Sequence, residues 1–104
     1  MPQEETKRDI YKKNLLQTRL SLAGLEYQLE RSKLQPTQKS DLIKAIYLIK
    51  TTVFELEKKL DEAKSDDDLL RWQVLTNYTI TSLISSKEIP EPMKTILKSL
   101  LIER

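Results

Sequence analysis

Hydrophobic residues recur every three or four positions along the first two thirds of the chain. One series is Tyr11, Leu15, Thr18, Leu22, Leu25 and Leu29, and the next is Leu42, Ile46, Ile49, Val53, Leu56, Leu60 and Ala63. Alternating steps of four and three are typical of a coiled-coil seam. The spacing predicts two long helices, at about 9–34 and 38–64, with a break at Pro36. Because the connection is short, we expect an antiparallel hairpin.

Helix-start signals divide the chain further. Thr6 and Asp9 resemble a capping box, with Asp in place of the usual Glu. Thr37 or Ser40 is expected to cap the second helix, and Ser65, followed by three aspartates, to cap a third. We therefore expect a flexible N-terminus at 1–8 and a single helical domain at 9–104.

The last third of the chain predicts two shorter helices, at about 66–85 and 92–102. Residues 74–84 are also rich in β-branched and aromatic side chains, a pattern typical of a strand. A helix is favoured because one strand would have no pairing partner in this chain, but both interpretations stay open. The fourth helix carries one apolar stripe, at Met93, Ile96, Leu97, Leu100 and Leu101. The predicted fold class is all-α, a small bundle built on a long helical hairpin.

A second apolar stripe lies opposite the first seam. On the first helix it comprises Leu16, Leu20, Ala23, Tyr27 and Leu34. The second helix repeats it weakly with Ile43, Tyr47 and Phe54, and the third helix has Leu70, Val74 and Tyr78 on a side of their own. A helix on the outside of a bundle needs only one apolar stripe. Either the chain's own helices cover these stripes or another protein does.

Composition removes most catalytic chemistry. The 104 residues include no Cys and no His, and only one Gly. Disulfides, Cys/His metal sites, histidine bases and glycine-rich phosphate loops are therefore excluded. The acidic residues around Asp66–Asp68 are explained by helix capping and match no calcium loop. We expect no enzyme activity, no cofactor and no metal site.

Charge and targeting signals give weaker indications. Lys and Arg total 18 against 16 Asp and Glu, a net charge of +2, which is too small for a strongly electrostatic nucleic-acid binder. Arg8, Lys12 and Arg19 nevertheless share one flank of the first helix, where they are candidates for phosphate contacts. The sequence has no signal peptide and no apolar run long enough to span a membrane, so we expect an intracellular protein, cytoplasmic or nuclear.

These features predict a non-catalytic interaction module, a scaffold or adaptor subunit that oligomerises or binds a protein partner through apolar helical seams. The candidate interface residues are Leu16, Leu20, Leu22, Leu25, Tyr27 and Leu29 on the first helix, and Ile96, Leu97 and Leu100 on the last. A small nucleic-acid-associated regulatory protein that uses the basic flank is the alternative. The pattern leaves open whether the partner is a second copy or a different protein.

Overall fold

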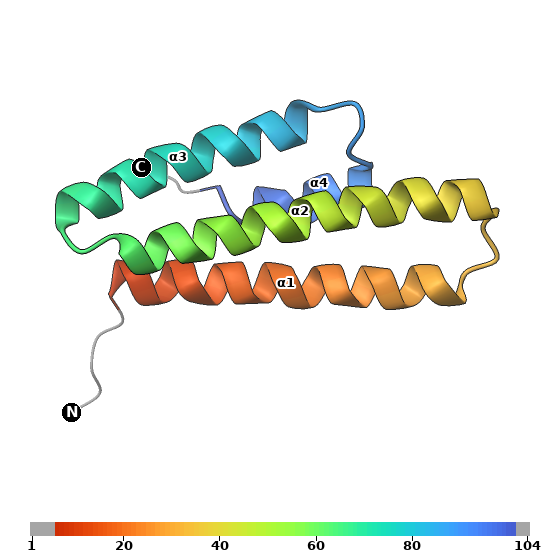
Figure 1. Cartoon of the computed structure of the whole chain (residues 1–104), viewed down its shortest axis with the longest axis horizontal. Coiled ribbons are helices and arrows are strands. Elements are labelled where there is room, and N and C mark those ends of the chain that lie inside the picture. Colours follow the sequence, from red (N-terminus) through yellow and green to blue (C-terminus); the bar gives the residue numbers. More distant parts are fainter. Residues whose placement is uncertain (1–5, 102–104) are drawn as a thin grey trace.

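Four α-helices make up residues 6–101, the part of the chain that the computed structural model describes (Figure 1). They are α1 (Lys7–Arg31), α2 (Pro36–Glu62), α3 (Asp66–Ser85) and α4 (Glu91–Lys98). These residues contain no strand, so the all-α fold is confirmed and residues 74–84 are helical. Of the expected flexible N-terminus, residues 7 and 8 already belong to α1. The expected helix ends at 34 and 102 are corrected, because α1 ends at Arg31 and α4 at Lys98. The residue before a proline is disfavoured in a helix, so the first helix cannot run up to Pro36. Residues 1–5 and 102–104 lie outside the described residues.

The predicted caps of α1 and α3 are confirmed. The Asp9 N–H donates to Thr6 Oγ1 at 3.2 Å, and the Thr6 N–H donates to Asp9 Oδ2 at 3.3 Å, which completes the capping box. The Asp68 N–H donates to Ser65 Oγ at 3.1 Å. Both caps satisfy amide groups that the first turn of a helix leaves without partners.

The start of α2 differs from the prediction. The helix begins at Pro36, and the residue before it, Gln35, makes no side-chain capping bond. Thr37 and Ser40 therefore lie inside the helix and do not cap it. The physical reason is that proline's fixed φ and missing N–H suit the first position of a helix, so Pro36 starts α2 and does not merely separate it from α1.

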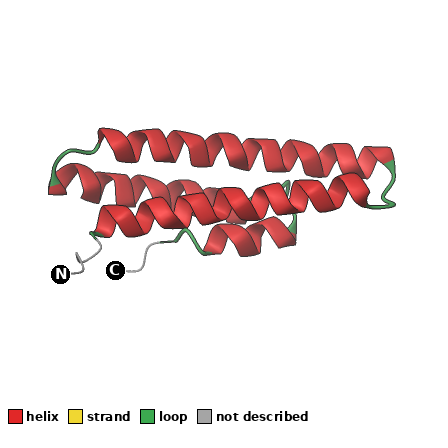
Figure 2. Ribbon diagram, turned by 90° about the horizontal axis from the view of Figure 1, so that it is seen from below, coloured by secondary structure: helices red, strands yellow, loops and turns green. Residues whose placement is uncertain are grey.

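Each helix packs against the next one in the chain, and α4 closes the ring by packing against α1. The hairpin partner α2 lies along α1, α3 packs on α2, and α4 returns between α3 and α1. Figures 1 and 2 both show the end of the hairpin that carries the α1–α2 turn projecting past α3 and α4. The bundle measures 50 × 31 × 21 Å. It is elongated because α1 and α2, with 25 and 27 residues, exceed α3 and α4 in length.

The predicted seams of α1 and α2 form the core. Leu15, Leu22, Ile49, Val53 and Leu60 are essentially inaccessible to solvent. α3 adds Trp72, whose indole Nε1 donates to the Leu56 carbonyl at 2.8 Å and whose ring stacks on Tyr11 at 5.1 Å between centroids. Trp72 is thus a core residue, with its polar N–H satisfied as a buried indole requires.

The short helix α4 docks on the chain itself. Met93, Leu97 and Leu100 are buried in the common core, and α4 contacts both α1 and α3. Eight residues are too few for an isolated helix to persist in water. Packing of these three side chains therefore holds α4 in place.

Candidate interaction surface

The outward side of α1 carries a second row of large apolar side chains. Leu16, Leu20 and Tyr27 are spaced by four and seven residues, and each is about half exposed. At 100° per residue these positions lie opposite the buried Leu15 and Leu22. The row therefore points away from the core, and no helix of the described chain covers it.

A matching row lies on α2. Ile43, Tyr47 and Phe54 fall within a narrow arc of the helix wheel and are likewise exposed, Tyr47 to 71%. Arg31 lies 4.9 Å from the centre of the Tyr27 ring, and Lys58 lies 5.7 Å from that of Phe54. These cations cover only one side of each ring, so most of the aromatic surface still meets solvent.

Three ion pairs between the helices place the two rows on the same side of the hairpin. Their separations are 3.0 Å for Lys12 Nζ and Asp61 Oδ1, 2.8 Å for Arg19 Nε and Glu57 Oε1, and 2.6 Å for Lys50 Nζ and Glu26 Oε2. On the wheel, each apolar row lies beside the ion-pair flank of its own helix, on the side away from the core. The rows are therefore parallel stripes on either side of a line of ion pairs.

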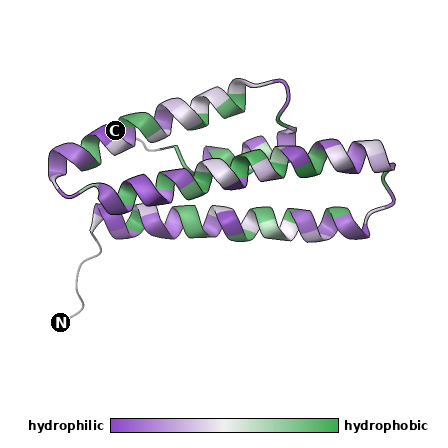
Figure 3. Cartoon of the chain, viewed as in Figure 1, coloured by the Kyte–Doolittle hydropathy of each residue, from purple (hydrophilic) through white to green (hydrophobic). Residues whose placement is uncertain are grey.

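We call this surface the hairpin face and define it by six exposed side chains. They are Leu16, Leu20, Tyr27, Ile43, Tyr47 and Phe54. Figure 3 shows hydrophobic segments recurring among hydrophilic ones along the visible sides of α1 and α2. A hollow of about 280 Å³ beside Leu16, bordered by Lys12, Arg19, Glu57 and Asp61, gives the face local relief.

The structure separates the predicted interface residues into two groups. Leu16, Leu20 and Tyr27 belong to the hairpin face, whereas Leu22, Leu97 and Leu100 are buried in the chain's own core. The expectation that these last three are available to a partner is corrected, because the chain's own helices cover them. Leu25, Leu29 and Ile96 are partly buried, and the first two pack against the core.

Three residues of the face were absent from the predicted interface. Ile43, Tyr47 and Phe54 show in the sequence only as a weak off-seam repeat, and the spacing within one helix does not say which side of another helix they join. The ion pairs between positions far apart in the sequence supply that information. The acid–base pattern that marks them, Lys12, Arg19 and Glu26 against Asp61, Glu57 and Lys50, was the usable signal.

The basic flank is largely neutralised within the chain. Lys12 and Arg19, two of the candidate phosphate contacts, are paired with Asp61 and Glu57. Arg8 is partly buried and lines a hollow with Lys64 and Asp66 at the start of α3. Phosphate binding by Lys12 or Arg19 would have to displace a carboxylate first, so this observation does not favour the nucleic-acid alternative.

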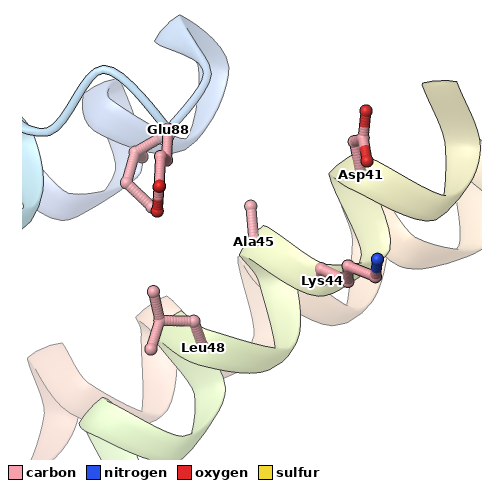
Figure 4. Close-up of a pocket in the computed structure, with 6 residues that line it drawn as sticks. Asp41, Lys44, Ala45, Leu48 and Glu88 are labelled. Atoms are coloured by element: carbon pink, nitrogen blue, oxygen red, sulfur yellow. The ribbon is translucent and has the colours of Figure 1, made fainter.

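Two further surface features are less developed. Leu70, Val74 and Tyr78 form a shorter exposed stripe on α3. A hollow of about 480 Å³ lies under the α3–α4 loop and is lined by Asp41, Lys44, Ala45, Leu48, Glu88 and Ile89 (Figure 4). In Figure 4 the Glu88 carboxylate points towards Ala45 and Leu48, whereas the Lys44 ammonium points away. The ionisable groups that line this hollow do not point to a common position, whereas a catalytic site needs groups that converge on the reacting atoms.

The chain matches no protein family model, no curated protein and no solved structure. Among residues 6–101, no group of three or more His, Cys, Asp or Glu side chains is placed to hold a metal ion. Within the same range, every helix is too short or too polar to cross a membrane. We therefore infer function from the surface of the fold.

Proposed function

We propose that this chain is a non-catalytic interaction module, a scaffold or adaptor subunit that binds a helical protein surface through the hairpin face. The observation that carries the proposal is the six large apolar side chains on one side of the hairpin, 40% to 71% exposed. Contiguous apolar patches of more than a few hundred Å² are rare on monomeric proteins and mark interaction sites. Scattered exposed leucines would carry no such meaning.

The shape of the face fits a helical occupant. Leu16, Leu20, Ala23 and Tyr27 repeat the four–three spacing of a coiled-coil seam on the outside of α1. A helix laid along the hairpin meets such a seam over several turns, with the line of ion pairs between α1 and α2 along one side of it.

A photo-reactive amino acid tests the proposal in the cells that produce the protein. Placed at Leu20, it should form a covalent adduct with another polypeptide on illumination. Placed at Gln17, which is also exposed but lies on a different side of α1, it should form none. Phe54→Glu in the same chain should abolish the Leu20 adduct, because Phe54 lies across the same face. Equal adducts from both positions, or none from either, would refute the proposal.

A further inference from the structure

We infer that the occupant of the hairpin face is a second copy of this chain, related by a twofold axis parallel to α1 and α2. This inference rests on the proposed function and names the partner. It draws on three properties of the face: its area, the register of its apolar rows and the order of its charges.

The area of the face is that of one side of a stable dimer. Six side chains of roughly 200 Å² each, about half exposed, present on the order of 600 Å². A standard protein–protein interface buries about 800 Å² on each partner. One further copy therefore supplies enough surface to cover the face.

The apolar rows are matched in register within one chain. Arg19 pairs with Glu57, and Glu26 pairs with Lys50. Moving seven residues forward along α1 therefore corresponds to moving seven residues back along the antiparallel α2. On this register Leu20 is level with Phe54, and Tyr27 with Tyr47, to within about half a turn, or ~3 Å.

A twofold rotation about an axis parallel to the helices keeps every residue at its level. It sets α1 of one copy against α2 of the other in antiparallel orientation, the usual neighbour relation in a four-helix bundle. Leu20 then meets Phe54 of the second copy, and Tyr27 meets Tyr47. Both contacts occur twice, as an isologous interface requires.

The charges obey the same symmetry. Along α1 the ion-pair residues are positive at Lys12 and Arg19 and negative at Glu26, and along α2 the residues at the same levels carry the opposite sign. With α1 facing α2 of the second copy, Arg19 meets Glu57 and Glu26 meets Lys50 again. Each ion pair thus joins a network of four alternating charges. A twofold axis perpendicular to the helices would set α1 against α1 and lose this match.

Light scattering on a sizing column measures the molar mass directly. Over two decades of concentration, the wild-type chain should reach twice 12.2 kDa. Leu20→Glu should reduce the mass to 12.2 kDa with an unchanged circular dichroism spectrum, since Leu20 is not part of the core. Gln17→Glu adds the same charge on another side of α1 and should leave the dimer intact. A dimer that survives Leu20→Glu uses another surface and overturns the inference.

Charge reversal tests the orientation. Arg19→Glu and Glu57→Arg should each weaken the dimer, because each sets like charges together within and between copies. Mixed in equal amounts, the two variants should form a heterodimer: Glu at position 19 of one copy faces Arg at position 57 of the other, although both internal pairs remain repulsive. A mixture that stays monomeric overturns this geometry.

The cross-linking experiment separates failure of the inference from failure of the proposed function. If the Leu20 adduct has the mass of two copies, both stand. If the adduct contains a different polypeptide and the purified chain stays at 12.2 kDa, the inference is overturned while the interaction face is retained. If no adduct forms and the chain stays monomeric, both are overturned.

Discussion

Two buried threonines in the core differ in what their hydroxyl groups meet. Thr18 and Thr76 are each only 1% exposed, but Thr18 Oγ1 donates to the Asn14 carbonyl at 2.9 Å, whereas Thr76 Oγ1 has no hydrogen-bond partner. An unsatisfied buried hydroxyl costs about 1–3 kcal/mol. Thr76→Val should therefore raise the free energy of unfolding by about 1 kcal/mol, measured in urea. Thr18→Val is the matched control and should gain less stability, because it removes the hydrogen bond to the Asn14 carbonyl. A Thr76→Val variant less stable than wild type would contradict this account.

The carboxylate of Asp68 makes stability depend on pH. The hydrogen bond from the Lys64 N–H to Asp68 Oδ2, helped by hydrogen bonds that the carboxylate accepts from Ser65 and by the charge of Arg71, holds the pKa of Asp68 below its usual value. A folded pKa below the unfolded one stabilises the protein above the unfolded pKa, and that contribution is lost as the pH falls through the folded pKa. Asp68→Asn should thus lower the urea midpoint near neutral pH, with the deficit vanishing in acid.

A neighbouring aspartate provides the control for that titration. Asp67→Asn removes the same charge from the first turn of α3 but leaves the bond between Lys64 and Asp68 in place. The Asp68 carboxylate still titrates in this variant, so the pH dependence of stability that Asp68 confers should be retained. Equal pH profiles for both variants would assign the effect to the helix dipole and not to the hydrogen bond.

At the scale of the element, α1 contains a glycine that its fold does not require. Gly24 has no positive φ, and a Cβ added there would meet nothing within 4 Å. Gly24→Ala should raise the free energy of unfolding by about 0.5–1 kcal/mol, since alanine restricts the unfolded chain. Ala23→Gly, at the next position, should lower it by a similar amount. Urea titrations in the Leu20→Glu background keep self-association out of the comparison, and a loss on Gly24→Ala would reveal a close contact.

Helix α4 depends on the residues that face the core. Leu97→Ala should lower the free energy of unfolding by about 2–5 kcal/mol, the usual range for a fully buried leucine. Ile96→Ala, one position away and only partly buried, should cost clearly less. Urea unfolding of the two variants measures the difference. Equal losses would mean that α4 does not hold the orientation described.

The helices themselves follow from local sequence, and their ends follow less well. The four–three spacing of seams such as Leu15–Leu22 and Ile49–Val53–Leu56 is strong enough to define two helices without tertiary information. The start of α2 was misplaced because a proline both breaks one helix and begins another, and the sequence does not distinguish these roles. Residues 74–84 needed the packing of Thr76 and Ile80 against the core to override their strand propensity.

At the scale of the whole molecule, the hydrophobic periodicity shows which side of a helix each residue occupies, but it does not show which other element covers that side. The spacing shows that α1 has two apolar sides, yet Leu22 and Leu16 are equivalent in the sequence and opposite in the fold. Burial depends on the length of α3 and α4 and on where α4 returns. Joining Tyr27 with Tyr47 on one face likewise requires the long-range pair of Glu26 and Lys50. The hairpin face is thus a tertiary property, which explains why only its α1 half was predicted.

Self-association through that face has a thermodynamic consequence beyond molar mass. Because the dimer binds a folded copy and not an unfolded one, mass action stabilises the native state more as concentration rises. The wild-type Tm should therefore increase with protein concentration. A tenfold increase in the ratio of dimer-bound to free native chain adds about 1.4 kcal/mol to the free energy of unfolding. The Leu20→Glu variant should melt at one temperature throughout, and the two proteins should converge on dilution, since Leu20 contributes little to the core of a single chain. Calorimetry at several concentrations measures both curves. A concentration-independent wild-type Tm would mean that the hairpin face remains uncovered in the purified protein.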